Sequence, residues 1–310
     1  MKTLISTRSF GEFDRKPLDK LKEAGFEIVL NPYGRSLEPE ESIELLEGAT
    51  GLIAGTEPLT EEVLNKAGSL KVISRCGTGM DNVDLEAAKR LGIKVLNTPD
   101  APTLAVAELT LGLILALYRR IAESDRCIRS GRWKRQMGQL LYRKKLGIVG
   151  LGRIGKRLVE LTTPFDLEVM TCEPSPDIEF VQRHNIQVLS FNELLKKADI
   201  VSLHLSCPKG THCLIGRNEL ALMKPSAILI NTSRGWMIDE EALYEALANK
   251  IIAGAALDVF ENEPYDGNLR NLDNVILTTH IGSSAKEARI KMEKDAVENL
   301  LEALPESKKG

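Results

Sequence analysis

The chain has 310 residues and a formal net charge of −3, and its residues are 43% hydrophobic and 27% charged. This length is sufficient for two domains with separate hydrophobic cores, and the composition is ordinary for a globular protein. The nearly balanced charge lacks the basic footprint of nucleic-acid-binding proteins, so no nucleic-acid partner is expected.

The first 99 residues alternate short apolar strands with helices that end at or near glycine, a pattern typical of a parallel sheet. The strands are predicted over residues 3–7, 27–30, 51–54, 72–74 and 93–96. The helices are predicted over residues 16–24, 39–47, 61–67 and 85–91. A turn-rich segment, residues 97–102, follows and is the predicted hinge.

A second α/β unit is predicted after a long helix over residues 103–120 and a polar stretch over residues 126–145. Its strands are predicted over residues 146–149, 167–172, 200–204, 227–231, 254–258 and 275–279. The final helix, residues 285–304, is expected to fold back onto the first unit. The predicted fold is therefore α/β with two doubly wound, Rossmann-like parallel-sheet domains. One domain is residues 1–99 plus 284–310, and the other is residues 100–283.

The cysteines and the first residues indicate a reducing compartment. The five cysteines are odd in number and lack framework spacing, and residues 1–8 lack the apolar segment of a signal peptide. We therefore expect a cytoplasmic protein. The most apolar helix, residues 104–118, contains Glu108 and is too short to span a bilayer. It is assigned to the core or to a dimer interface, and no membrane partner is expected.

A glycine-rich turn follows the strand at residues 146–149. Gly150, Gly152 and Gly155 have the G-x-G-x-x-G spacing, and a helix opens near Ile154. The first glycine permits the turn, the second lets a pyrophosphate approach the backbone, and the third lets helix and strand pack closely. The helix N-terminus offers N–H groups and partial positive charge to the phosphates.

The strand at residues 167–172 ends at Glu173, where an acidic residue would hold a ribose 2′-hydroxyl. Residues 174–177 contain no arginine or lysine for a 2′-phosphate, so the pattern favours NAD over NADP. Residues 100–283 are therefore predicted to be the NAD-binding domain, and residues 1–99 plus 284–310 the substrate domain. The alternative is an ordinary βαβ crossover with a glutamate at the surface.

Hydride transfer to a carbonyl needs a cation for the substrate carboxylate, a proton donor and acceptor, and a group that tunes the donor. Arg234 suits the first task because guanidinium binds carboxylate bidentately, and His280 suits the second because its pKa is near neutrality. Glu263 or Asp258 suits the third, because a nearby carboxylate raises the pKa of a histidine.

Five segments in order, residues 75–84, 150–155, 231–235, 256–264 and 280–282, resemble the signatures of the D-isomer-specific 2-hydroxyacid dehydrogenases. The resemblance covers nearly the whole chain, and the 3-phosphoglycerate dehydrogenases are the nearest branch. It implies NAD-dependent chemistry on a 2-hydroxy or 2-keto acid, two α/β domains with the active site in a cleft that closes around a hinge, and a homodimer.

The resemblance also implies residue roles. Arg234 would bind the substrate carboxylate and carbonyl, and His280 would be the general acid/base with Glu263 as its partner. Substrate binding would involve Arg75 and the backbone N–H groups of Cys76 and Gly77. The residues implied in cofactor binding are Gly150, Gly152, Arg153, Ile154, Gly155, Glu173, His204, Thr232, Ser233, Asp258, which would hold the nicotinamide carboxamide, and Gly282.

The substrate side chain is open at this stage. Phosphoglycerate enzymes often have a phosphate-binding arginine near the position of Gly55, whereas Glu57 here would repel a phosphate and Arg75 is the cation that would compensate. The leading hypothesis is a 3-phosphoglycerate dehydrogenase of serine biosynthesis without C-terminal regulatory domains. The alternative is a hydroxypyruvate or glyoxylate reductase. A distant alternative is a non-enzymatic, NAD-sensing corepressor-like scaffold, which the complete catalytic set disfavours.

Metal binding is not expected. His204, Cys207, His212 and Cys213 crowd into ten residues, but their spacing matches no common structural-zinc pattern. The loop at residues 207–211 is expected to border the cofactor, with His212 at the surface.

Overall fold

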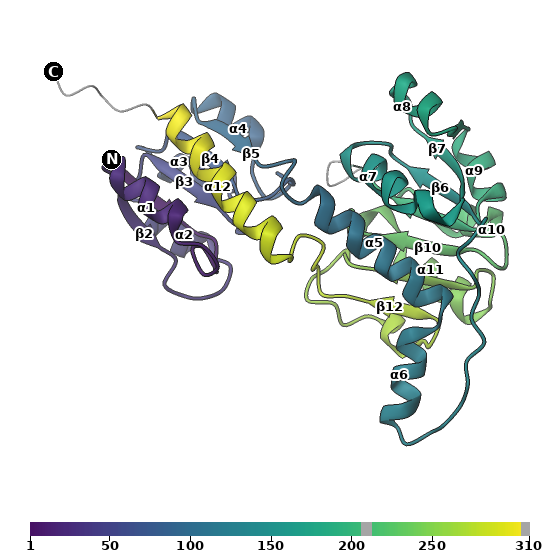
Figure 1. Ribbon diagram of the computed structural model, residues 1–310. Helices are drawn as coiled ribbons and strands as arrows, with labels where there is room; N and C mark the ends of the chain where they lie inside the picture. The colour runs from purple at the N-terminus through teal and green to yellow at the C-terminus, as the bar shows by residue number, and fades with distance from the viewer. Residues whose placement is uncertain (206–212, 305–310) are drawn as a thin grey trace. The chain divides into compact units, whose positions relative to one another are not determined.

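The computed structural model describes residues 1–205 and 213–304. The chain forms two compact units (Figure 1). Unit 1 consists of Met1–Pro102 and Ser283–Gly310, and unit 2 consists of Thr103–Gly282.

The unit boundary falls after Pro102, whereas the sequence places it after residue 99. The turn-rich segment stays with unit 1 because its residues are held there. The Thr98 N–H donates to Gly77 O (3.0 Å), and Ala101 is buried in a core cluster of unit 1. The next boundary lies before Ser283 rather than residue 284.

Unit 1 contains a five-stranded parallel sheet in the order β2-β1-β3-β4-β5. Its strands are β1 (Lys2–Ile5), β2 (Glu27–Leu30), β3 (Gly51–Ala54), β4 (Val72–Arg75) and β5 (Lys94–Asn97). Its helices are α1 (Lys16–Glu23), α2 (Pro39–Leu45), α3 (Glu61–Lys66), α4 (Leu85–Arg90) and α12 (Lys286–Ala303).

The two faces of this sheet are covered by different helices because the strand side chains alternate. On one face, Leu52 and Ile73 pack with Leu64 of α3. On the other face, Ile53 packs in one cluster with Leu300 of α12. The C-terminal helix thus completes the core of unit 1, so this unit is discontinuous in sequence (Figure 1).

Unit 2 contains a seven-stranded parallel sheet in the order β12-β11-β10-β9-β6-β7-β8. Its strands are β6 (Lys145–Val149), β7 (Glu168–Cys172), β8 (Gln187–Val188), β9 (Ile200–Leu203), β10 (Ile228–Asn231), β11 (Gly254–Leu257) and β12 (Val275–Leu277). Its α-helices are α5 (Thr103–Tyr118), α6 (Ile121–Arg129), α7 (Arg153–Thr162), α8 (Ile178–Arg183), α9 (Phe191–Lys197), α10 (Arg217–Leu222) and α11 (Glu240–Ala248). The predicted fold class, α/β with two parallel sheets, is confirmed.

Each sheet has a point where the strand order reverses. In unit 2 it lies between β6 and β9, and in unit 1 between β1 and β3. Ligands of open α/β sheets bind at the carboxyl ends of the strands beside such a point, because the crossover helices there leave in opposite directions and open a crevice. These two edges are therefore where each unit is expected to bind its ligand.

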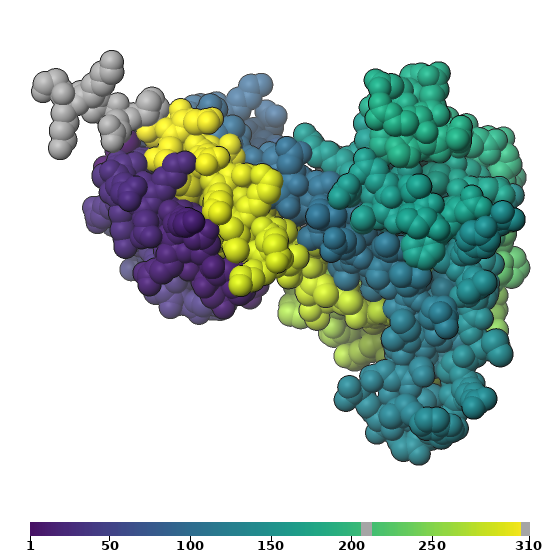
Figure 2. Space-filling view, in the orientation of Figure 1, coloured from purple at the N-terminus to yellow at the C-terminus, as the bar shows by residue number. Residues whose placement is uncertain are grey.

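Helix α6 was not predicted, because the sequence assigns residues from Arg126 onward to a polar stretch. The long helix α5 ends at Tyr118, and Arg120 adopts a left-handed conformation (φ +52°), after which α6 begins with only Cys127 buried. Helix α6 and the segment after it protrude from unit 2 (Figure 2). No helix in the described part of the chain is both long enough and apolar enough to cross a membrane.

Candidate active site

The glycine loop after β6 has the geometry that a dinucleotide requires. Gly150 has φ +94°, and a Cβ there would lie 2.8 Å from the carbonyl oxygen of His204. A Cβ on Gly155 would lie 2.6 Å from Gly150 O, so α7 packs closely on the turn. A Cβ on Gly152 would meet nothing within 4 Å. This open approach at the N-terminus of α7, where Arg153 and Ile154 begin the helix, fits a pyrophosphate.

Glu173 lies beside this loop at the end of β7. Its Oε2 accepts a hydrogen bond from the Leu151 N–H (3.0 Å), and its Oε1 accepts one from the Ser175 N–H (3.2 Å). Lys156 of α7 pairs with Asp177 across 2.7 Å. The two hydrogen bonds fix the Glu173 carboxylate at the glycine turn. There it would accept a hydrogen bond from a ribose hydroxyl and repel a 2′-phosphate.

The residues after β9 and β10 hold one another at the carboxyl edge of the sheet. His204 Nε2 lies 2.8 Å from Ser202 Oγ, and burial lowers the pKa of His204 to about 4, so this ring is neutral near pH 7. Thr232 Oγ1 contacts Thr110 Oγ1 of α5 (3.0 Å), and Ser233 Oγ donates to Leu203 O (2.5 Å). Thr232 and Ser233 therefore anchor the loop that carries Arg234.

The loop after β10 lies directly on the loop after β11. A Cβ on Gly235 would lie 1.8 Å from the carbonyl carbon of Phe260, so only glycine permits this approach. Arg234 Nη1 donates to Ser233 O (2.7 Å), and the guanidinium lies 5.9 Å from the centroid of the Trp236 ring. The positive charge of Arg234 contributes to lowering the pKa of Glu263. The sequence indicated neither this backbone contact nor its effect on the position of Arg234.

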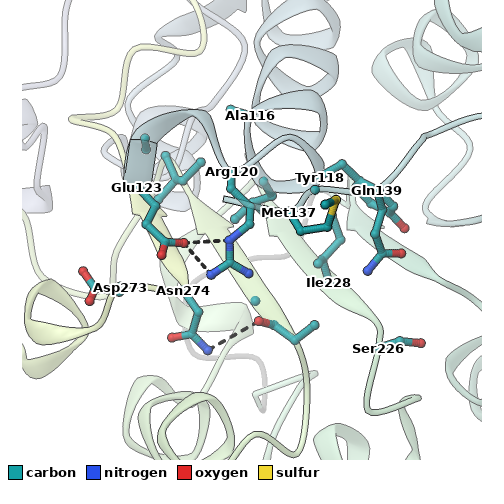
Figure 3. A pocket seen from close by; sticks show the side chains of 16 residues that line it. Ala116, Tyr118, Arg120, Glu123, Met137, Gln139, Ser226, Ile228, Asp273 and Asn274 are labelled. Atoms are coloured by element: carbon teal, nitrogen blue, oxygen red, sulfur yellow. Dashed lines mark hydrogen bonds and ion pairs between the residues drawn. The ribbon is translucent and has the colours of Figure 1, made fainter. Parts of the chain in front are cut away.

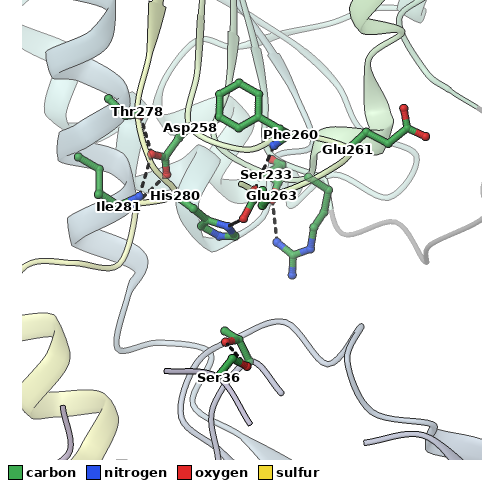
Figure 4. A network of polar contacts seen from close by, with 12 residues as sticks. Ser36, Ser233, Asp258, Phe260, Glu261, Glu263, Thr278, His280 and Ile281 are labelled. Atoms are coloured by element: carbon green, nitrogen blue, oxygen red, sulfur yellow. Dashed lines mark hydrogen bonds and ion pairs between the residues drawn. The ribbon is translucent and has the colours of Figure 1, made fainter. Parts of the chain in front are cut away.

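Asp258 is buried at the end of β11 (1% exposed) and ties down the loop after β12 (Figure 4). Its Oδ1 accepts hydrogen bonds from Thr278 Oγ1 (2.6 Å) and the Ile281 N–H (2.8 Å), and its Oδ2 accepts one from the Gly282 N–H (2.7 Å). His280, between these donors, has the uncommon left-handed conformation (φ +54°). Asp258 thus holds the backbone that presents His280, a function the sequence did not indicate. Its contact with nicotinamide stays a prediction.

His280 and Glu263 form the central pair of the site (Figure 4). His280 Nδ1 lies 2.9 Å from Glu263 Oε2, while Glu263 Oε1 accepts a hydrogen bond from the Phe260 N–H (3.1 Å). The hydrogen bond to Glu263 raises the pKa of His280, although burial opposes it. Burial raises the pKa of Glu263, but the hydrogen bond and charge of His280 outweigh this and lower it. Glu263, rather than Glu261 or Asp258, is therefore the carboxylate bonded to the histidine ring.

The predicted substrate loop after β4 is internally bonded in unit 1. The Cys76 N–H donates to Ala54 O (2.9 Å), and the Gly77 N–H donates to Thr98 Oγ1 (2.9 Å). Binding of a substrate carboxylate by these amides would require it to replace those acceptors. Burial raises the pKa of the Cys76 thiol to about 11, so it has little thiolate character near pH 7.

Residues 1–205 and 213–304 contain no group of three or more histidine, cysteine, aspartate or glutamate side chains placed to hold a metal ion. Cys213 Sγ instead lies 3.1 Å from Ile215 O. Cys207 and His212 fall outside the described residues.

Figure 3 shows a pocket in unit 2. It is lined at the amino ends of β10, β11 and β12 by Ser226, Gly254 and Asn274, and Arg120 donates to Glu123 beside it (2.8 Å). It contains none of the predicted site residues.

Comparison with known proteins assigns the family. Residues 111–282 match the model of the D-isomer specific 2-hydroxyacid dehydrogenase NAD-binding domain, which confirms the predicted dinucleotide cofactor. A glyoxylate reductase of Thermococcus litoralis is 43% identical over 298 residues, 91% of this chain and 88% of that protein. A D-3-phosphoglycerate dehydrogenase of Methanocaldococcus jannaschii is 45% identical over 259 residues, 82% of this chain, and the matched region spans about half (49%) of that relative.

Among solved structures, the TT0316 protein from Thermus thermophilus superposes with a TM-score of 0.90 at 40% identity, covering 98% of this chain and 97% of that one. The chain therefore belongs to the D-isomer-specific 2-hydroxyacid dehydrogenases, and unit 2 carries the family's NAD-binding domain.

Proposed function

We propose that this protein is an NAD-dependent reductase of small 2-keto acids, with glyoxylate or hydroxypyruvate as substrate. The observation that carries the proposal is the His280–Glu263 pair, 2.9 Å apart, at the carboxyl edge of the NAD-binding unit. The glyoxylate reductase relative supports the choice of substrate because the match extends over most of both chains.

The proposed roles follow from the contacts of each side chain. NADH, when bound beside the glycine loop, would supply the hydride for the carbonyl carbon. Because His280 Nδ1 faces Glu263, Nε2 is the nitrogen that donates a proton to the carbonyl oxygen during reduction and accepts it during oxidation. Glu263 stabilises the imidazolium. Arg234 binds the substrate carboxylate, which its guanidinium can do through two parallel hydrogen bonds.

The second candidate is oxidation of 3-phosphoglycerate, as predicted first from the sequence. The 45% identity to a phosphoglycerate dehydrogenase supports it, although the chain spans about half of that relative. Arg75 is the cation that this reading requires for the phosphate.

A single set of assays separates these candidates. The protein is mixed with NADH and either glyoxylate or hydroxypyruvate, and separately with NAD⁺ and 3-phosphoglycerate, while NADH absorbance is followed. We expect turnover of the small keto acids and a loss of about 10²–10⁴-fold in His280→Ala. Turnover of 3-phosphoglycerate alone would favour the second candidate, and no turnover of any of them would overturn the proposal.

We also propose that the protein forms a homodimer through α6 and the segment after it. Trp133, Met137 and Leu140 are 85%, 90% and 71% exposed in the single chain. Aromatic residues and methionine are enriched at protein interfaces, and a surface with several such side chains indicates a partner.

A further inference from the structure

The backbone of Arg234 is held on both sides, so the position of its charge depends on how the side chain is restrained. The carbonyl oxygen of Arg234 accepts hydrogen bonds from Asn231 Nδ2 (2.9 Å) and the Met237 N–H (3.3 Å). The next residue, Gly235, lies against the backbone of Phe260. The guanidinium, by contrast, is at the end of a long and flexible side chain, and ordering such a side chain costs conformational free energy. A contact that orders it before a ligand arrives strengthens binding of that ligand.

Trp236 provides such a contact. It belongs to the single 3₁₀ turn Gly235–Met237, which begins directly after Arg234. The guanidinium carbon of Arg234 lies over the Trp236 ring, 5.9 Å from its centroid. This distance is within the range of a cation–π interaction, for which tryptophan is the strongest of the aromatic side chains. The ring therefore attracts the guanidinium toward one position.

The Trp236 ring is itself held by apolar packing. It is partly buried against the core cluster of unit 2 that includes Met237 and Leu243. Its Nε1 is buried and has no hydrogen-bond partner among the described residues. A buried indole N–H normally has a partner, and the lack of one costs free energy. Stability alone would favour an apolar side chain without this N–H at residue 236, which indicates that the large ring face has another function.

A ring face suits this function because it occupies none of the N–H groups of a guanidinium. A carboxylate partner would use the N–H groups with which arginine binds a substrate carboxylate through two parallel hydrogen bonds. The other contact of this kind is also to a neutral group, because Arg234 Nη1 donates to Ser233 O (2.7 Å). Trp236 and Ser233 thus restrain the cation without opposing its charge.

We propose that Trp236 is a positioning residue that holds the Arg234 guanidinium, by a cation–π interaction, in the orientation that binds the carboxylate of a 2-keto acid. This inference rests on the proposed function. Both residues belong to unit 2, as does His280. Trp236 acts through Arg234 and not on the reacting carbonyl. Loss of the ring should therefore weaken binding of the carboxylate and leave hydride transfer nearly unchanged.

The test measures reduction of glyoxylate by the full-length protein with NADH. Trp236→Leu removes the ring face and keeps an apolar side chain, and Trp236→Phe keeps a smaller ring in case the leucine variant does not fold. Tyr244→Leu is the matched control, because Tyr244 is a partly buried aromatic residue of α11 that packs against the same core cluster. Thermal unfolding establishes that each variant is folded. Calorimetry with oxamate and the NADH-loaded protein measures affinity for a carboxylate beside a carbonyl without turnover.

We expect KM for glyoxylate and Kd for oxamate to rise about three- to tenfold in Trp236→Leu, and by a smaller factor in Trp236→Phe. The values of kcat and of KM for NADH should stay within about twofold of the wild type, because a contact made equally in the ground state and the transition state affects KM alone. Tyr244→Leu should leave KM for glyoxylate near the wild-type value.

A double-mutant cycle determines whether Trp236 acts through Arg234. In an Arg234→Gln background, which lacks the cation, Trp236→Leu should lower kcat/KM for glyoxylate by no more than about twofold. An equal loss with and without Arg234, an unchanged KM in folded Trp236→Leu, or an equal rise in Tyr244→Leu would overturn the inference. If the wild type reduces no 2-keto acid, it is the proposed function that fails, and oxamate binding still tests the contact between Trp236 and Arg234.

Discussion

At the scale of single residues, the pair of His280 and Glu263 predicts a pH profile. Reduction needs a protonated His280, and the hydrogen bond to Glu263 raises the pKa of His280, so reduction should persist to higher pH than a free histidine would allow. Glu263→Gln removes this effect, and the pH above which kcat/KM for reduction falls should therefore move down. Glu261→Gln is the control, because it removes a carboxylate two residues away while the ring of His280 bonds Glu263. An unmoved profile in Glu263→Gln would contradict the assignment.

Glu173 makes a second prediction at this scale, about cofactor choice. Glu173 accepts a hydrogen bond from the Leu151 N–H at the glycine turn. Glu173→Ala should therefore weaken binding of the ribose, and it also removes the charge that repels a 2′-phosphate. We expect KM for NADH to rise and the preference for NADH over NADPH to fall by about tenfold, the size of one charge-assisted hydrogen bond. Glu179→Gln, a neighbour paired with Arg183 on α8, should leave the preference unchanged. If Glu173→Ala and Glu179→Gln show the same preference for NADH over NADPH, Glu173 takes no part in ribose recognition.

At the scale of elements, the contact between the loops after β10 and β11 predicts different costs for two glycine substitutions. Gly235→Ala places a Cβ against the Phe260 backbone and should lower the free energy of unfolding by about 3 kcal/mol or more, because backbone must move. Gly152→Ala meets no atom within 4 Å and has an ordinary negative φ, so its melting temperature should stay near the wild-type value while NADH binding weakens. Chemical denaturation and NADH titration measure both effects. Equal stability of the two variants would show that the loops are not in backbone contact.

At the scale of the whole molecule, the exposed apolar side chains around α6 predict self-association. Sedimentation should give about twice the chain mass of 34.2 kDa, and Trp133→Asp should shift it toward the single-chain mass because a charge in an interface core is costly to desolvate. Ile178→Asp, which adds the same charge at another exposed apolar residue (58% exposed), should leave the mass unchanged. A wild type that sediments as a single chain would refute the dimer, and an equal effect of both substitutions would refute the interface at α6.

Much of the fold could be predicted from the sequence because its determinants are local. The strand at residues 51–54 and the glycine spacing at residues 150–155 have the predicted bounds and turn, since strand periodicity and positive φ depend on neighbours in the chain. Helix α6 was missed for a local reason as well. Two residues, Arg119 and Arg120, separate it from α5, and the residue type of Arg120 does not predict its left-handed conformation.

The chemistry of the site was predicted as a set of residue types, whereas its geometry depends on loops that are distant in sequence. The sequence by itself determined the family motifs, the dinucleotide turn and the candidates Arg234, Glu263 and His280. The tertiary structure decided that Glu263 rather than Asp258 bonds the ring, that Asp258 holds the His280 loop, and that the Glu57 carboxyl is buried beside Ser6. These contacts join residues 17 to 51 positions apart, and burial and hydrogen bonding across such separations arise only when the sheets bring their strand ends together.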